Sequence, residues 1–333
     1  MKYSIILPVR NGGEYVKECV NSILTQELNN FNLHVLDNCS TDGTLQWIES
    51  LNDSRIFTYP SSKSLSIEDN WGRIKDIPKN EFITLIGHDD VLEKNYLSVM
   101  DELIKKHPDA CLYQTHFRYI DAQSKCIKRC KPMDEVQSAS EFLALFLCNI
   151  IDANGTGFMM RSKDYDTLGG IPTYPNLLFA DFELWINASL IGYKATAFEE
   201  CFAFRLHQST TSTSADIKMQ LAFNQFINYL EQLKSKNLLL KAVIERYGVD
   251  FISFYSKGLA HRLMRTPKNK RNGESVVSFL EQCKLYADRL VPGNSFNPVD
   301  NFSVKLATYI DSNAVTRGLF LAFKKIYSKP VLS

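Results

Sequence analysis

Two adjacent carboxylates, Asp89 and Asp90, are the residues of this sequence with the clearest chemical potential. They follow the apolar stretch 82–86 and a glycine, so they stand directly after a predicted strand. Neighbouring negative charges repel each other unless a cation lies close to both, and a hard divalent ion bound to substrate phosphates meets that need. The pair predicts a metal–diphosphate site; the alternative is a solvated turn or an N-cap for the helix expected from Lys94.

A third acidic residue, Asp37, also follows a predicted strand. The polar residues Ser40, Thr41 and Asp42 come shortly after it and are typical of a cap for the next helix. Because Asp37 precedes that cap, we expect its carboxylate to face the ligand and to accept hydrogen bonds from a nucleotide base or ribose.

These side chains need a scaffold that brings strand ends together. The first 120 residues alternate short apolar runs with amphipathic segments of helical period, which indicates βαβ units and a mostly parallel sheet covered by helices on both faces. Ligands of such sheets bind outside the carboxyl ends of the strands. The expected strands span residues 3–8, 32–36, 55–59, 81–86 and 110–117. The expected helices span residues 14–26, 41–51, 67–76 and 94–107.

The second half of the chain divides into two regions. After a less regular stretch at 121–156, the pattern predicts a strand at 157–161 and a helix at 181–191. Beyond the Ser/Thr-rich segment 209–214 only helical patterns follow. We therefore expect an α/β domain over residues 1–214 and a helical C-terminal region over residues 215–333.

Composition excludes several classes of protein. Hydrophobic residues make up 45% and charged residues 23%, as in ordinary globular proteins, and the net charge of +1 provides no general attraction for nucleic acid. The longest apolar run, near 142–151, is about half of the ~20 residues that span a bilayer. The start of the chain reads as a strand, so we expect a cytoplasmic protein with reduced cysteines.

Read in order, these motifs resemble the N-terminal signature of family 2 glycosyltransferases with the GT-A fold. The resemblance rests on the strand ending in Pro8-Val9-Arg10-Asn11 and on the later Gly87-His88-Asp89-Asp90. It covers about two thirds of the chain, whereas the helical remainder resembles no family that we can name. Its further segments are residues 14–22, 37–44, 157–161, 169–170, 179–185 and 205–207.

The resemblance implies roles for individual residues. Pro8 and Asp37 border the nucleotide base, and Asp90 is similar to the last acid of the DxD motif, which holds a Mn²⁺ or Mg²⁺ ion that bridges the diphosphate. Asp181 resembles the general base that deprotonates the acceptor hydroxyl; the alternative is an N-terminal charge that complements the helix dipole. His207 resembles a histidine that reaches the metal or the diphosphate.

Other donor-binding residues are expected at the same edge. Arg10, Arg73 and Arg205 are candidate phosphate contacts, because a guanidinium binds oxyanions with two hydrogen bonds. Asn70 falls where relatives approach the nucleotide, and Asp89 supplies the second carboxylate of the acid pair.

The sequence departs from the family pattern at two positions. His88 replaces the first acid of the DxD motif, and Ala180 stands before the predicted base where many relatives have an acid. The Gln-x-x-Arg-Trp motif of processive polysaccharide synthases is also absent, which favours transfer of a single sugar.

The resemblance therefore implies an inverting, metal-dependent enzyme that moves a hexosyl or N-acetylhexosaminyl group. The donor is a nucleotide-diphosphate sugar, UDP-sugar by default, and the acceptor is a hydroxyl of a glycan or lipid-linked molecule in bacterial surface polysaccharide synthesis. The alternatives are a sugar nucleotidyltransferase and a non-catalytic protein that binds sugar nucleotides. The nucleotidyltransferases normally carry a Gly-rich, basic N-terminal loop, and residues 11–14 lack that character.

The helical end contains a basic run at 262–271 and a segment at 317–329 that combines apolar with basic residues. Such a segment can lie on an anionic membrane surface, so the resemblance leads us to expect a peripheral protein at the inner face of the membrane. A helix packed on the protein, with solvated lysines, is the alternative.

Overall fold

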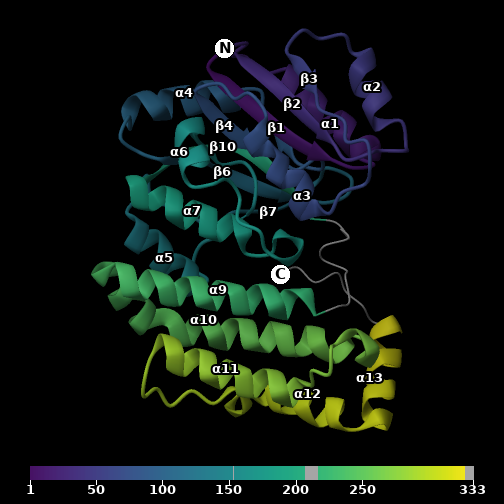
Figure 1. Ribbon diagram of the computed structural model, residues 1–333, viewed down its shortest axis with the longest axis vertical. Coiled ribbons are helices and arrows are strands. Elements are labelled where there is room, and N and C mark those ends of the chain that lie inside the picture. The colour runs from purple at the N-terminus through teal and green to yellow at the C-terminus, as the bar shows by residue number, and fades with distance from the viewer. Residues whose placement is uncertain (153, 207–216, 327–333) are drawn as a thin grey trace. The chain divides into compact units, whose positions relative to one another are not determined.

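A mixed β-sheet organises the first of two units in the computed structural model, which describes residues 1–152, 154–206 and 217–326 (Figure 1). This unit comprises Met1–Phe142 and Ile151–His207, and the second comprises Leu143–Ile150 and Gln208–Ser333. The predicted domain boundary, at residue 214, falls within residues 207–216, which lie outside the described residues. In neither unit do the described residues form a helix with the length and hydropathy that a bilayer crossing requires.

The sheet has the strand order β3-β2-β1-β4-β9-β6-β10-β5. The pairs β1·β2, β1·β4, β2·β3 and β6·β10 are parallel, and β9 runs antiparallel to both β4 and β6. Strands β1, β2, β3, β4, β6 and β10 therefore run in one direction and end at the same edge of the sheet. The predicted α/β fold with a mostly parallel sheet is confirmed. The strands are β1 (Tyr3–Val9), β2 (Phe31–Asp37), β3 (Ile56–Thr58), β4 (Phe82–Leu85), β5 (Val91–Leu92), β6 (Leu112–Ile120), β7 (Cys126–Arg129), β8 (Val136–Gln137), β9 (Met159–Arg161) and β10 (Lys194–Arg205).

Burial explains why these segments form the core of the first unit. All seven residues of β1 are buried, and all except Ser4 are apolar, as is typical of a central parallel strand. Helix α1 buries Val16, Cys19, Val20 and Ile23, which lie on one face at helical spacing. The helices of this unit are α1 (Gly13–Leu24), α2 (Thr44–Ser50), α3 (Ile67–Gly72), η1 (Arg73–Asp76), α4 (Tyr96–Lys106), α6 (Ser162–Thr167), η2 (Pro175–Leu177) and α7 (Ala180–Ile191), and α5 (Ala139–Leu147) extends into the second unit.

The second unit is helical (Figure 1). Helices α9 and α10 meet at Asn237, whose Oδ1 accepts hydrogen bonds from the backbone N–H groups of Leu239 and Leu240 and so starts α10. Phe223 and Phe226 each pack against Phe251 with ring centres 5.7 Å apart. The elements are α9 (Lys218–Lys236), α10 (Leu238–Arg265), η3 (Lys268–Lys270), α11 (Val276–Leu290), η4 (Pro298–Asp300), α12 (Phe302–Ser312) and α13 (Ala314–Ile326).

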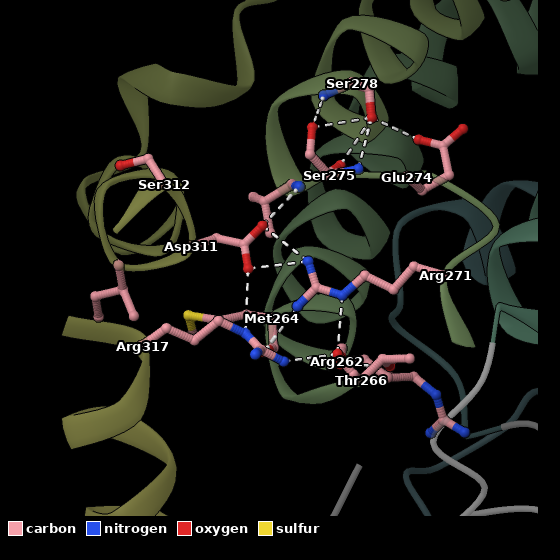
Figure 2. Close-up of polar contacts among 12 residues, drawn as sticks. Arg262, Met264, Thr266, Arg271, Glu274, Ser275, Ser278, Asp311, Ser312 and Arg317 are labelled. Carbon is pink, nitrogen blue, oxygen red and sulfur yellow. Dashed lines mark hydrogen bonds and ion pairs between the residues drawn. The ribbon is translucent and has the colours of Figure 1, made fainter. Parts of the chain in front are cut away.

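A buried ion pair joins the end of α10 to α12 (Figure 2). The Arg271 guanidinium donates from Nη1 to both Asp311 carboxylate oxygens at 2.9 Å, and it also donates to the carbonyls of Thr266 and Met264. The Arg271 side chain is 1% exposed. Arg271 therefore does not belong to a solvated basic run, because it caps the carboxyl end of α10 and neutralises Asp311.

Replacing Asp311 with alanine should lower the free energy of unfolding of the helical unit by about 3–5 kcal/mol. The variant leaves the Arg271 guanidinium buried without its counter-charge. Far-UV circular dichroism during denaturant titration measures this loss. Trp47, Trp71 and Trp185 lie in the first unit, so their fluorescence follows that unit separately.

Glu281→Ala is the matched control for this variant. Glu281 pairs with Lys284 on the exposed face of α11, and such a surface pair contributes under about 1 kcal/mol. An Asp311→Ala protein that unfolds at the same denaturant concentration as the Glu281→Ala protein would contradict the stabilising role of the buried pair.

Candidate active site

The acid pair lies at the carboxyl end of β4, and its two carboxylates converge. A Cβ atom added to Gly87 would lie 2.8 Å from Asp89 Oδ1 and 2.9 Å from Asp90 Oδ2, so a side chain at position 87 would collide with both. Asp90 is buried; Thr156 Oγ1 donates to its Oδ2 at 2.6 Å, and the backbone N–H of Arg205 donates to its Oδ1 at 3.0 Å. Burial, and then the Asp89 charge, raises the pKa of Asp90 well above its usual range.

This arrangement fits a divalent cation that is shared with phosphate oxygens. Ionised Asp90 is costly beside Asp89 unless a positive charge compensates for both carboxylates. Among the residues that the structure describes, no group of three or more His, Cys, Asp or Glu side chains could enclose a metal. Asp89 and Asp90 would supply the protein ligands and the substrate the others, which is how Mg²⁺ is commonly held. His207, the other predicted ligand, lies outside the described residues.

Arg205, at the end of β10, holds the acid pair Asp89 and Asp90 in position. Its fully buried guanidinium donates from Nε to the Asp89 carbonyl at 2.7 Å and from Nη2 to Glu18 Oε2 at 2.6 Å. Its Nη1 donates to the Asp121 carbonyl and to Ser124 Oγ, both at 2.9 Å. Because these acceptors all belong to the protein, the structure shows a positioning group where the sequence led us to expect a phosphate contact.

The end of β2 forms a second polar cluster around Asp37. This residue is 1% exposed, and its Oδ2 accepts a hydrogen bond from the Ser40 backbone N–H at 3.1 Å. Among the described residues its Oδ1 has no hydrogen-bond partner, which is unusual for a buried carboxylate oxygen. An Asp37 Oδ1 atom without a hydrogen-bond donor is consistent with the predicted contact between Asp37 and the nucleotide.

Asn70 of α3 and Arg73 of η1 form hydrogen bonds around the polar cluster at Asp37. The Asn70 amide donates to the Leu36 carbonyl at 3.3 Å. Arg73 Nη1 donates to Asn70 Oδ1 at 2.9 Å and to the Asp37 carbonyl at 3.2 Å, and its Nη2 donates to the Tyr59 carbonyl. Asn70 is buried and Arg73 is partly exposed, and both side chains bind protein carbonyls beside Asp37.

Pro8 and Arg10 lie at the carboxyl end of β1. Pro8 is buried opposite Leu36, and Arg10 is exposed just beyond the strand. Asn11 follows with a φ of 52°, and its Oδ1 accepts a hydrogen bond from the Thr41 N–H at 2.8 Å. The loops after β1 and β2 are thus tied together, with Arg10 at the same edge of the sheet as Asp37.

Asp181 lies in the first turn of α7, close to the loop that holds Asp90. Burial raises the pKa of Asp181 to about 6, although the residue remains partly accessible to solvent. A Cβ atom added to Gly155 would lie 3.0 Å from Asp181 Oδ2, and the next residue, Thr156, binds Asp90. Thr156 therefore binds the predicted metal ligand, and the adjacent Gly155 lies beside the predicted base.

The segment before Asp181 has a strained backbone. Asn176, Leu177 and Phe179 have φ values of 55°, 56° and 70°, and bulky residues rarely occupy this left-handed region. The Asn176 N–H donates to Glu68 Oε1 at 2.7 Å, which fastens the segment to α3. Glu68 thus connects the nucleotide side of the site to the segment that leads to Asp181.

Sequence reasoning missed Gly155, Thr156 and Glu68. Residues 155 and 156 fall in the stretch 121–156, which has no clear period, and the only local signal is a threonine flanked by two glycines. Glu68 reads as an ordinary first-turn acid of α3, where carboxylates favour the helix dipole. The Thr156–Asp90 hydrogen bond joins residues 66 positions apart, and the Asn176–Glu68 hydrogen bond joins residues 108 positions apart.

A sheet whose strand ends carry a convergent acid pair, next to a carboxylate that opens a helix, defines a glycosyltransferase domain of the GT-A type. Residues 4–169 match the model of glycosyl transferase family 2, and the chain belongs to this family. An uncharacterized glycosyltransferase of Rickettsia typhi is 23% identical over 258 residues, which cover 76% of this chain and 80% of that protein. The poly(ribitol-phosphate) β-N-acetylglucosaminyltransferase TarS of Staphylococcus aureus is 31% identical over 117 residues, or 32% of this chain and 19% of that protein.

Solved structures of S. aureus TarS share the fold. A fragment crystallised with UDP-GlcNAc superposes with a TM-score of 0.61 at 14% identity, and the match covers 99% of this chain and 93% of that one. The structural similarity therefore includes the helical C-terminal region, for which the sequence suggested no family.

Proposed function

We propose that this glycosyltransferase is an inverting, metal-assisted enzyme that transfers a single sugar from a nucleotide-diphosphate sugar to a hydroxyl group. The observation that carries the proposal is the loop at residues 155–156, in which Thr156 binds Asp90 and Gly155 lies beside Asp181. A metal–diphosphate site and a base must lie close together for an in-line displacement, because leaving group and nucleophile are on opposite sides of one carbon.

Asp181 has the properties that the base of this reaction needs. A carboxylate with a pKa of about 6 is largely ionised at neutral pH and is more basic than an ordinary aspartate. It accepts the proton of the acceptor hydroxyl while that oxygen bonds to the anomeric carbon. The bond from this carbon to the diphosphate oxygen breaks, and the nucleoside diphosphate leaves with the electron pair. A single displacement inverts the anomeric configuration.

Asp89 and Asp90 hold the diphosphate end of the donor through the cation. The cation, when bound, stabilises the negative charge that develops on the departing diphosphate. Arg205 keeps the Asp89 backbone in place, and its own N–H orients the Asp90 carboxylate. Arg10 is the exposed guanidinium at this edge and is the arginine that we propose for a phosphate contact.

We propose UDP-sugar as the donor and a glycan or lipid-linked hydroxyl in surface polysaccharide synthesis as the acceptor. The TarS structure with UDP-GlcNAc supports a uridine nucleotide. The name of TarS, a poly(ribitol-phosphate) β-N-acetylglucosaminyltransferase, supports a hydroxyl-bearing polymer as the acceptor. The unpaired Asp37 Oδ1 is the group that we assign to the nucleoside.

The test is incubation with UDP-, GDP- and dTDP-sugars in the presence of manganese, without an acceptor. We expect one donor to release free nucleoside diphosphate slowly and to raise the melting temperature, since a ligand of the folded state stabilises it. Exchange that requires pyrophosphate would indicate a nucleotidyltransferase. Binding without turnover would indicate a protein that only binds sugar nucleotides.

Replacing Glu68 with alanine should lower kcat about tenfold and leave nucleotide affinity unchanged. The variant removes a hydrogen bond to a charged acceptor, worth about 1.5–3 kcal/mol, that holds the strained segment before Asp181. Glu68→Gln is the matched control, because its amide oxygen can still accept the Asn176 N–H. Equal kcat values for the two variants would show that Glu68 does not position the base.

A further inference from the structure

The buried Arg205 guanidinium forms an ion pair with Glu18 of α1. Arg205 Nη2 donates to Glu18 Oε2 at 2.6 Å, and the Arg205 side chain is fully buried. The acid pair meets Arg205 through the backbone instead: Asp89 offers its carbonyl to the guanidinium, and Asp90 accepts the Arg205 backbone N–H. A buried cation requires a counter-charge, and Glu18 supplies it from outside the predicted metal site.

Glu18 is held in this position by a second segment of the chain, the loop between β6 and β7. Ser124 Oγ donates to both Glu18 carboxylate oxygens, at 2.7 Å and 2.9 Å, and accepts a hydrogen bond from Arg205 Nη1 at 2.9 Å. The Tyr15 ring centre lies 4.6 Å from the guanidinium carbon of Arg205. The Glu18 carboxylate is therefore fixed against the guanidinium, although its side chain is 40% exposed.

The charges of Glu18, Arg205 and the acid pair act at one place, next to the buried thiol of Cys19. Cys19 Sγ donates to the carbonyl of Gly87, at the start of the loop that carries the acid pair, at 3.4 Å. Burial raises the pKa of this thiol most; the acid pair and Glu18 raise it further, and Arg205 lowers it. Three carboxylates thus face one guanidinium. Without the Glu18 charge, Arg205 would offset one of the two carboxylates that remain.

We propose that Glu18 is a positioning residue for the divalent cation: it compensates for the charge of Arg205 and so leaves the full negative charge of Asp89 and Asp90 to the metal. An uncompensated guanidinium beside the acid pair would repel a cation. The inference rests on the proposed metal-assisted function, because it assigns the cation to Asp89 and Asp90.

The test is a titration of the full chain with Mn²⁺ at saturating UDP, in which electron paramagnetic resonance measures the free ion. We expect Glu18→Gln to raise the Kd for Mn²⁺ about tenfold, the lower end of the effect of groups that support metal ligands. The glutamine oxygen still accepts the Arg205 N–H, so this variant changes the charge and keeps the contact. With a chelator present, Glu18→Gln should bind UDP at least as tightly as the parent, because a less negative site does not repel a diphosphate more strongly.

Two variants separate the charge of Glu18 from its contacts. Glu14→Gln removes a carboxylate from the same helix, where Glu14 is exposed and paired with Lys17. Ser124→Ala removes a hydrogen-bond partner of Glu18 and changes no charge. Both should bind Mn²⁺ like the parent.

Three results would overturn the role of Glu18. The first is an equal Kd for Mn²⁺ in Glu18→Gln and the parent. The second is an equal weakening of Mn²⁺ binding by Ser124→Ala, which would assign the effect to geometry. The third is a parallel loss of UDP affinity in chelator, which would indicate a damaged site. A parent that binds UDP but no Mn²⁺ is a distinct outcome, because it would refute the proposed metal site together with this inference.

Discussion

Asp181→Asn should lose on the order of 10²–10⁴-fold in transfer rate while it keeps the fold and the nucleotide affinity of the parent. The amide has the same shape as the carboxylate but cannot accept the proton of the acceptor hydroxyl, and a positioned base contributes a factor of this size. Product release from a donor and acceptor pair measures the rate, and titration with nucleoside diphosphate measures the affinity.

The pH dependence tests the same role without a mutation. Because burial raises the pKa of Asp181 to about 6, kcat/KM of the parent should rise as the pH increases through about 6 and the carboxylate ionises. The raised pKa contributes stability at low pH that is lost as the pH rises from 3.8 to about 6. The asparagine variant should thus be at least as stable as the parent at neutral pH, so unfolding cannot explain its lost activity.

Two results would remove Asp181 from the mechanism. The first is near-parental transfer by the asparagine variant. The second is a product with the same anomeric configuration as the donor, because a single attack from the face opposite the leaving group must invert that configuration.

Asp90→Asn should lower turnover on the order of 10²-fold or more and abolish the dependence of donor binding on manganese. The amide can still accept the Arg205 N–H and contact Thr156, but it removes a carboxylate that holds the cation beside the diphosphate. A thermal-shift titration with UDP, with and without manganese, measures the coupling between metal and nucleotide.

The unliganded Asp90→Asn protein should not be less stable than the parent. The buried Asp90 carboxylate, with its raised pKa, destabilises the fold once it ionises, and the amide carries no charge. Asp76→Asn, at an exposed acid of η1, is the control for a general loss of negative charge. Full activity of the parent in a metal chelator would contradict the metal-assisted mechanism.

Local patterns were enough to predict the scaffold and the position of its acids. The mostly apolar sequence of β1 and the helical spacing of Val16, Val20 and Ile23 in α1 reflect local burial patterns, so they are visible in the sequence. Asp37, Asp89 and Asp90 could be placed at one edge because parallel strands end together. The short strands β5, β7 and β8 were missed, since two to four residues carry no period. The long strand β10 was missed as well, because exposed residues at a bulge interrupt its buried pattern.

The roles of the cationic side chains were decided by tertiary structure. Arg205, Arg73 and Arg271 read as solvent-facing phosphate or membrane contacts, yet each donates to protein acceptors: Arg205 to Glu18, 187 residues away, and Arg271 to Asp311, 40 residues away. A guanidinium binds a carboxylate or a row of carbonyls as readily as a phosphate. The presence of an arginine at a given position in the sequence therefore does not show which of these acceptors the folded protein places beside it.

The sequence by itself determined a GT-A-type sheet, an acid pair at the end of β4 and a carboxylate at the start of α7. Only the tertiary structure decided that the Gly155–Thr156 loop binds Asp90 and lies beside Asp181, and that Glu68 holds the segment before Asp181. The physical reason is range: secondary structure follows from burial and hydrogen bonding between near neighbours. These contacts instead join residues 66 or more positions apart, or depend on a glycine that leaves room for the Asp181 carboxylate.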